Sequence, residues 1–221
     1  TRMVGATIMA HGDDQGMVLP PNVAPVQVVV IPISRTDEER AAVEAALEPL
    51  EQELRTVMTA SGPLRWQVDR REESPGFKFN HWELRGVPLR LEIGPRDVAA
   101  EQAVLVRRLD RAKETLSLNA IGGQLAGRLA GYQQEVFQRA IAFRAANSHE
   151  VDDYDTFKAT VEERGGFLYA HWCGDSTCER QINEETGATI RVIPFESSGG
   201  PGKCLIDGRP SSQRVLFARA Y

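Results

Sequence analysis

The sequence has 221 residues, of which 42% are hydrophobic and 26% are charged, and its net charge is −5 at neutral pH. The length gives room for one large domain or two modest ones, and the apolar content is sufficient for a hydrophobic core. No apolar run approaches the roughly 20 residues of a membrane helix, and the negative charge argues against indiscriminate binding to nucleic acid. Thr1 is neither an initiator methionine nor the start of a signal peptide, which predicts the C-terminal part of a longer chain.

The first half of the chain alternates between expected strands and expected helices. Apolar or β-branched runs predict strands at residues 5–10, 26–33, 64–69 and 88–93. A helix is expected to begin at Thr36, where Glu39 completes a capping box, and to be kinked or split at Pro49. A shorter helix at 76–85 and a hairpin at 103–118 follow. This alternation predicts an α/β layer structure.

The second half of the chain is expected to begin with a long helix. Residues 119–150 have helical apolar spacing for most of their length, and a second helix is expected at 154–164. A smaller α/β unit then contains a cysteine-bearing helix between strands at 167–172, 188–195 and 214–221. The boundary between the two domains is expected near residues 119–125.

Charge is unevenly distributed along the chain. Residues 65–113 contain 11 Lys/Arg and 8 Asp/Glu, whereas the remainder contains 15 and 23. A locally basic region in an acidic protein is typical of a chain whose partner is anionic but is selected by specific contacts.

The stretch from Ser74 to Asp97 lies in this basic region. It presents an aromatic side chain, two acids and two bases, at Phe79, Glu83, Arg90, Arg96 and Asp97. An unpaired guanine needs this set of groups, because an acid accepts from its N1–H and N2–H₂ donors, a base donates to O6 and N7, and an aromatic ring stacks on it. The same pattern is also typical of a solvated amphipathic helix beside an edge strand.

Three cysteines near the C-terminus indicate a metal site in a reducing compartment, because they are too few for a disulfide scaffold. Cys173 and Cys178 are followed by Cys204, and Asp207 stands where a fourth cysteine is expected. Structural zinc usually takes four Cys or His ligands but also accepts a carboxylate. Three interpretations remain open: a Cys₃Asp site, a site that recruits another ligand such as His171, and packed thiols without a metal.

Three blocks of the sequence together resemble prolyl-tRNA synthetases of the archaeal/eukaryote-like type. They are residues 1–27, residues 74–97, and Cys173–Glu179 with Cys204 and residues 215–221. The resemblance runs through essentially the whole chain in unbroken order. It implies the end of a class II catalytic domain at 1–24, a mixed-sheet anticodon-binding domain with flanking helices at 25–120, and a smaller α/β, zinc-binding-like C-terminal domain at 121–221.

The resemblance also implies an activity for the complete protein. Such enzymes activate proline with ATP and Mg²⁺ and transfer it to tRNA(Pro), in the cytoplasm and usually as homodimers. Arg2 matches the family's arginine that holds the nucleotide phosphate, a role that suits a guanidinium. Tyr221 matches the C-terminal tyrosine whose carboxylate lies near the catalytic centre. The first and second class II motifs are absent from this segment, so it does not build the active site alone.

The resemblance assigns anticodon contacts as well. Every proline anticodon ends in two guanines, and the family's contact residues fall on Phe79, Glu83, Arg90, Arg96 and Asp97. A further lysine falls on Lys113, with one extra residue just before it in this chain. The alternative is a non-catalytic RNA-binding module derived from such a domain. A small metal-binding adaptor is a weaker alternative, because it leaves the first two blocks unexplained.

Overall fold

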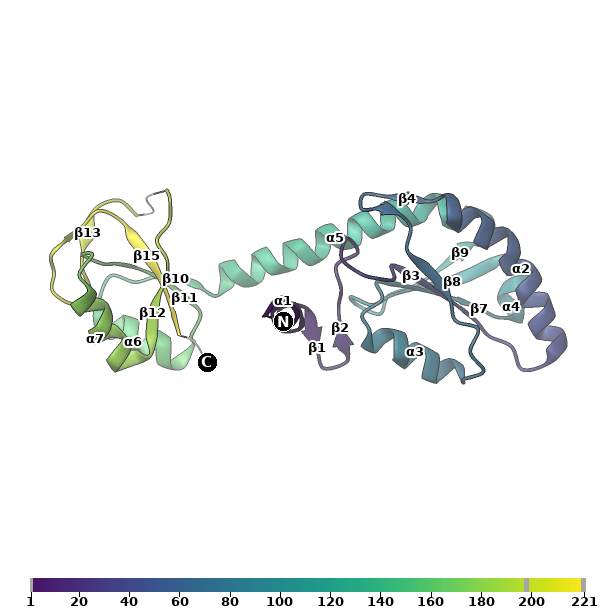
Figure 1. Cartoon of the computed structure of the whole chain (residues 1–221), viewed down its shortest axis with the longest axis horizontal. Coiled ribbons are helices and arrows are strands. Elements are labelled where there is room, and N and C mark those ends of the chain that lie inside the picture. The colour runs from purple at the N-terminus through teal and green to yellow at the C-terminus, as the bar shows by residue number, and fades with distance from the viewer. Residues whose placement is uncertain (1, 197–198, 220–221) are drawn as a thin grey trace. The chain divides into compact units, whose positions relative to one another are not determined.

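The structure is a computed structural model in which residues 2–196 and 199–219 are described. The chain forms two compact units, residues 1–138 and 139–221 (Figure 1). Each unit is described by itself. Among the described residues, no helix is both long enough and apolar enough to cross a membrane.

A mixed five-stranded sheet forms the centre of the first unit, with strand order β6-β3-β7-β8-β9. β3 (Val28–Pro32) lies parallel to both β6 (Trp66–Val68) and β7 (Leu89–Ile93). β8 (Gln102–Arg107) and β9 (Lys113–Ser117) complete the sheet as an antiparallel hairpin. The β-branched run at β3 is buried along almost its full length, as expected of a central parallel strand.

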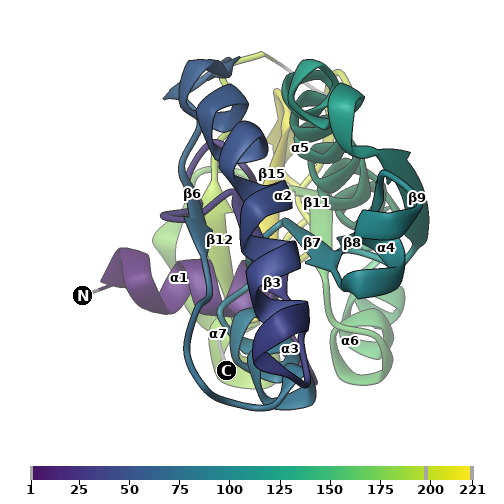
Figure 2. The ribbon, with the colours of Figure 1, turned by 90° about the vertical axis from the view of Figure 1, so that its right-hand side faces the viewer.

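Helices cover both faces of this sheet. α2 (Asp37–Thr56) and the first part of α5 (Ile121–Ala146) pack on one face, in a core that includes Val28 and Leu91. α2 crosses in front of the sheet in Figure 2. α3 (Pro75–Leu84) packs on the other face, where Trp82 belongs to one buried cluster with Val29 and Ile31. The alternation of the strands thus divides the sheet side chains between two cores.

The ends and the middle of α2 follow from its sequence. The Thr36 hydroxyl accepts from the Glu39 N–H at 3.2 Å, while the Glu39 carboxylate accepts from the Arg35 N–H at 2.7 Å. The helix continues through Pro49 as one element, so of the expected kink or split the split does not occur and the kink stays a prediction. Buried side chains lie on both sides of the proline, at Val43, Leu47, Leu50 and Leu54. Their packing outweighs a proline cost of about 3 kcal/mol.

The expected strand at residues 5–10 is a helix instead. α1 (Arg2–His11) buries none of its residues, and Met3, Ile8 and Met9 are all more than half exposed. A strand needs a neighbour for its backbone hydrogen bonds, and no described strand pairs with this segment. A helix satisfies those groups locally, which explains the difference.

The loop after α1 is a tight hairpin, β1 (Gly12–Asp13) and β2 (Gly16–Met17). It contacts the end of α3 so closely that a Cβ at Gly16, whose φ is +125°, would lie 2.5 Å from Leu84 Cα. Asp13 accepts two hydrogen bonds from the buried guanidinium of Arg108, at 2.9 and 2.5 Å. Both contacts hold this segment against the rest of the first unit.

Short elements complete the first unit. They are the strand pair β4 (Met58–Thr59) and β5 (Gly62–Pro63), the helix α4 (Pro95–Ala99) and a 3₁₀ turn at Leu118–Ala120. The compact units divide inside α5, between residues 138 and 139, whereas the sequence placed the boundary near the start of this helix, at 119–125. Leu125, Leu129, Tyr132 and Val136 of α5 pack into the first core, which explains this position. The division into family domains at 1–24, 25–120 and 121–221 stays a prediction.

The second unit contains a four-stranded sheet with order β10-β11-β15-β12. Its strands are β10 (Ser148–Glu150), β11 (Phe167–His171), β12 (Ala188–Val192) and β15 (Arg214–Arg219). The helices are α6 (Tyr154–Glu163) and α7 (Ser176–Thr186), and β13 (Gly202–Lys203) pairs with β14 (Pro210–Ser211). Phe157 and Phe217 are fully buried and meet edge to face at 5.3 Å in its core. The unit therefore has a hydrophobic core of its own.

Candidate nucleic-acid interface and metal site

The register of the sheet places charged side chains beside α3. Arg90 on β7 is paired with Val106 on β8, which is paired with Lys113 on β9. Arg90 is also the register partner of Val29, whose side chain packs against α3. Residues paired across a sheet share a face, so Arg90 and Lys113 lie on the face that α3 covers only in part.

A cavity of about 120 Å³ lies between α3, β7 and the β8–β9 hairpin. It is lined by Trp82, Glu83, Val87, Arg90, Val106, Arg107, Arg108, Arg111 and Lys113. Three of the expected contact residues, Glu83, Arg90 and Lys113, are thus brought together. Phe79, a fourth, lies against this group, because the Arg90 guanidinium carbon is 4.3 Å from the centre of its ring.

The acids and bases of this group are paired with one another in the free chain. Glu83 accepts from Arg111 Nε at 2.7 Å rather than from Arg90. Arg90 Nε donates to Glu92 at 2.9 Å, and Lys113 Nζ lies 3.9 Å from the same carboxylate. Glu92 and Arg111 were missed as members of the group. Residues two apart in a strand share a face, so the sequence could have predicted that Glu92 lies beside Arg90. The position of Arg111 depends on the hairpin turn and could not have been predicted in this way.

Arg96 and Asp97, the other two expected contact residues, lie in α4 directly after β7. The Asp97 carboxylate accepts from the Gly94 N–H at 2.9 Å and so caps the start of α4. Arg96 is exposed. Neither residue lines the cavity beside Glu83. Both follow the C-terminal end of β7, where α4 packs against α2 and β8.

The second cluster of chemically active groups lies in the second unit. One ligand atom from each of Cys173, Cys178, Cys204 and Asp207 lies within 4.8 Å of all the others. Cys173 Sγ is 3.6 Å from Cys178 Sγ and 3.5 Å from Asp207 Oδ2. Around a tetrahedral zinc ion, sulfur and oxygen ligands lie about 3.5–3.8 Å apart. The donor set and these two distances therefore fit a zinc ion.

Comparisons with known proteins match both units of the chain. A family model described as "Anticodon binding domain" matches residues 27–127, and one described as "Prolyl-tRNA synthetase, C-terminal" matches residues 154–221. Proteins named "Proline--tRNA ligase" from Chloroflexus aurantiacus and Cytophaga hutchinsonii are 48% and 44% identical over the whole of this chain.

The chain belongs to the prolyl-tRNA synthetase family. It spans less than half of those two relatives, 45% and 44% of their lengths, and corresponds to their C-terminal portion. The mixed α/β fold and the family expected from the sequence are confirmed. The archaeal/eukaryote-like type stays a prediction. In this synthetase segment Arg2 is exposed at the start of α1, and Tyr221 lies outside the described residues.

One buried carboxylate fixes α3 of this synthetase domain in place. The Asp69 side chain is 1% exposed and accepts from Trp82 Nε1 at 2.7 Å and from Arg71 Nε at 2.9 Å. Hydrogen bonding from Arg71 holds the pKa of Asp69 well below its usual range. Lys78, also buried, donates to the Asp69 carbonyl at 3.1 Å. The position of the candidate contact residues on α3 therefore depends on Asp69.

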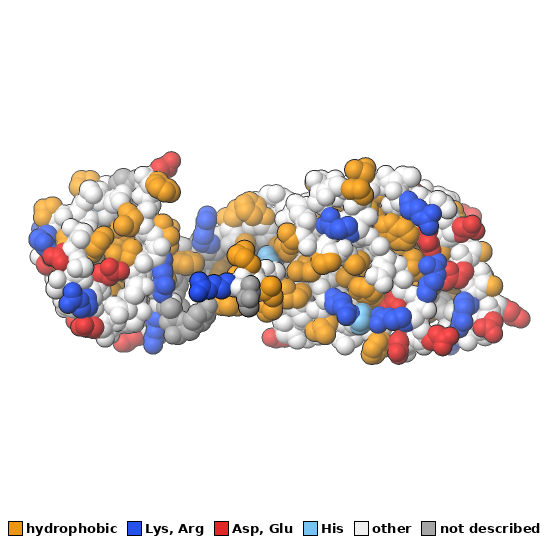
Figure 3. Space-filling model, in the orientation of Figure 1, with side chains coloured by type: hydrophobic (Ala, Val, Ile, Leu, Met, Phe, Trp, Pro, Cys, Tyr) orange, Lys and Arg blue, Asp and Glu red, His pale blue; other side chains and the backbone are white. Residues whose placement is uncertain are grey.

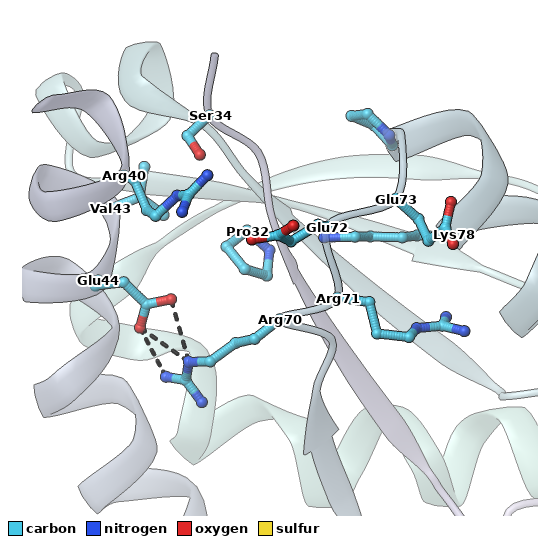
Figure 4. A pocket seen from close by; sticks show the side chains of 11 residues that line it. Pro32, Ser34, Arg40, Val43, Glu44, Arg70, Arg71, Glu72, Glu73 and Lys78 are labelled. Carbon is cyan, nitrogen blue, oxygen red and sulfur yellow. Dashed lines mark hydrogen bonds and ion pairs between the residues drawn. The ribbon is translucent and has the colours of Figure 1, made fainter. Parts of the chain in front are cut away.

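A larger cavity of about 530 Å³ lies at the ends of β3 and β6 (Figure 4). Arg70 pairs there with Glu44 at 2.8 Å, and the Lys78 side chain extends along the cavity. Arg40, Glu72 and Glu73 also line it. Because acids and bases are mixed along its wall, the cavity has no clear preference for a charged ligand.

The electrostatics of the cysteine cluster are those of a site that releases protons when it binds a metal. Burial raises the pKa of Cys178 to about 12 and also raises that of Cys173. The hydrogen bond from Cys178, at 3.1 Å, lowers the pKa of Asp207. Arg209 donates to Asp207 Oδ2 at 2.6 Å and partly offsets the negative charge of a Cys₃Asp set. Zinc replaces thiol protons when it binds such groups.

His171 is not part of the metal cluster. It is buried, and its Nδ1 lies 3.2 Å from the Ser211 hydroxyl. Of the three interpretations of the cysteines, the one that recruits His171 is therefore not supported by the described residues.

Proposed function

We propose that this chain is the anticodon-reading portion of a proline–tRNA ligase, which activates proline with ATP and transfers it to tRNA(Pro). The convergence of Glu83, Arg90 and Lys113 on one cavity beside Phe79 carries the proposal. The match of residues 27–127 to an anticodon-binding domain supports it. The relatives' name supports the ligase over a non-catalytic RNA-binding module.

Recognition of guanine would require Glu83 and a neighbouring base to leave their present ion-pair partners and bind the guanine instead. In the free chain Glu83 is paired with Arg111, and Arg90 with Glu92. A guanine that enters this group offers N1–H and N2–H₂ to Glu83, and accepts at O6 and N7 from a freed base. Arg111 is more than half exposed and its ion pair is of the kind worth about 0–1 kcal/mol, so the exchange costs little. The Phe79 ring with Arg90 against it is a surface on which a base can stack.

Other residues of the chain have proposed roles that rest on the family. Arg96 and Asp97 would contact the anticodon from the end of β7. Arg2 would hold the ATP phosphates with Mg²⁺ in the complete enzyme, and the carboxylate of Tyr221 would lie near its catalytic centre. A homodimer in the cytoplasm is proposed on the same ground.

We also propose that Cys173, Cys178, Cys204 and Asp207 hold a structural zinc ion. The spacing of their ligand atoms supports this. Bound zinc would connect the start of α7 to the turn after Cys204, two segments that are far apart in the sequence. It would have no part in the chemical step, because four protein ligands leave zinc no open position.

Glu83→Gln and Arg90→Ala test the reading of the anticodon. Each is expected to weaken binding of tRNA(Pro) about 5- to 150-fold, the equivalent of about 1–3 kcal/mol for a lost base contact. Filter binding or fluorescence anisotropy with the full chain measures the dissociation constant. Glu38→Gln, an exposed acid on α2, is the matched control and should have no effect. Unchanged affinity in both variants, with intact circular dichroism spectra, would show that these residues do not read the anticodon.

A further inference from the structure

The helix α3 has two different flanks on either side of its buried stripe. Glu83 lines the small cavity described above, and Phe79, four residues before it, lies against the Arg90 guanidinium of the same cavity. Phe77 and His81 form a second four-residue pair on the opposite flank, and their rings stack at 6.2 Å. Arg85 continues this second row after another four residues. Residues at this spacing lie one above the other on a helix, so the second flank is a continuous surface.

A cavity of about 680 Å³ lies beside the second flank. Its apolar part is formed by Leu19, Pro25, Val26, Val68, Trp82 and Val87. Its polar part includes Arg71, His81 and Arg85. The volume lies in the range of pockets that hold small organic ligands, about 300–1,000 Å³. Basic side chains and a histidine gather over α3, with hydrophobic side chains between them (Figure 3).

The charge of this flank is positive and only partly compensated. Arg85 Nη1 lies 2.8 Å from His81 Nδ1, and Arg71 Nη1 lies 3.5 Å from the same nitrogen. Desolvation, then these two cations, lower the pKa of His81, so the ring accepts and carries no charge. The carboxylate of Asp69 is already occupied by Arg71 and Trp82. Arg85 has no carboxylate partner among the described residues.

This combination of groups matches the chemistry of an RNA nucleotide. A phosphate needs guanidinium donors, which Arg85 and Arg71 supply. An unpaired base needs an aromatic or apolar surface, which the half-exposed Phe77 ring and the cavity wall supply. Trp82 and Val87 line both cavities, so the two sites adjoin across α3.

We propose that the cavity beside Phe77, His81 and Arg85 binds a nucleotide next to the anticodon guanines, with its phosphate on Arg85 and Arg71. The inference rests on the proposed function and adds to it a contact that does not read sequence. The RNA strand would then pass from one flank of α3 to the other, with bases read on the Glu83 side and the backbone held on the Arg85 side.

The test compares two anticodon stem-loops, one ending its anticodon in two guanines and one with adenines in their place. Arg85→Gln in the full chain is expected to weaken binding of both RNAs by the same factor, about three- to tenfold near 0.1 M salt. It should also reduce the slope of log K against log salt by about 0.7–0.9, the value for one lost phosphate contact. Arg85→Lys should keep the slope, since it keeps the charge. Arg55→Gln, an exposed arginine on α2, is the matched control.

The outcomes separate this inference from the function on which it rests. If Glu83→Gln weakens only the guanine RNA while Arg85→Gln changes neither affinity nor slope, the second site is wrong and the anticodon reading stands. If Arg85→Gln weakens only the guanine RNA, Arg85 reads a base and the backbone contact is wrong. If neither variant has any effect on either RNA, both the second site and the proposed function are wrong.

Discussion

Zinc is expected to raise the free energy of unfolding of the second unit by about 4 kcal/mol when free zinc exceeds its dissociation constant a thousandfold. The reason is that only the folded chain brings Cys173, Cys178, Cys204 and Asp207 together, so the binding free energy adds to the stability of the fold. Thermal unfolding of the chelator-treated chain, with and without added zinc, measures the gain.

Two variants make this experiment specific. Cys178→Ser should abolish the zinc-dependent gain, because a buried ligand is lost. Asp155→Asn, an acid on α6 whose side chain is 94% exposed, is the matched control and should keep the full gain. Metal analysis of protein purified without chelator gives an independent measure. Less than about a tenth of an equivalent of zinc, together with no gain in stability, would mean that the thiols are simply packed.

Replacing Asp69 by alanine is expected to lower the free energy of unfolding of the first unit by about 3 kcal/mol, the lower end of the range for breaking a buried ion pair. The substitution leaves the buried Trp82 N–H without an acceptor and Arg71 without its partner. Arg71 is 40% exposed and regains water, which is why we expect the lower end. Urea unfolding followed by tryptophan fluorescence measures the change.

The stabilisation of the first unit by Asp69 is expected to depend on pH in one direction. The pKa of Asp69 is lowered in the folded chain, so its stabilisation is fully present above the ordinary aspartate pKa. It is lost only as the pH falls through the lower folded value. Asp37→Ala, whose side chain is 98% exposed, should change the stability little at any pH. A loss below about 0.5 kcal/mol for Asp69→Ala would contradict the anchoring role.

Much of the fold was predictable because local signals and packing agree. The helix expected at 76–85 forms as α3 (Pro75–Leu84), and the continuous β-branched run expected at 26–33 contains β3. The sequence did not indicate β10 or the β13–β14 pair, because strands of two or three residues leave little periodicity to detect. α1 was missed because its apolar run was interpreted as a buried strand.

The candidate sites were predictable to different degrees. The metal cluster combines two short spacings, Cys173 to Cys178 at the start of α7 and Cys204 to Asp207 in a turn. Its four residues meet as the first of the three interpretations expected. The group that we propose reads guanine depends on a three-strand register and on a hairpin turn, which position Glu92 and Arg111 beside the expected residues. Its members could be predicted, but the pairs they form in the free chain could not. Arg111 adopts a φ of +58°, a backbone conformation that is uncommon for arginine and could not be predicted from its residue type.

The most direct test of guanine recognition by this chain changes the RNA and leaves the protein intact. The dissociation constant of the unmodified full chain is measured for the two stem-loops that differ only in the last two anticodon positions. Recognition by Glu83, Arg90 and their neighbours predicts that the guanine RNA binds at least about tenfold more tightly than the adenine RNA at the same salt concentration. Equal affinities for the two RNAs would contradict recognition of the anticodon guanines by this chain.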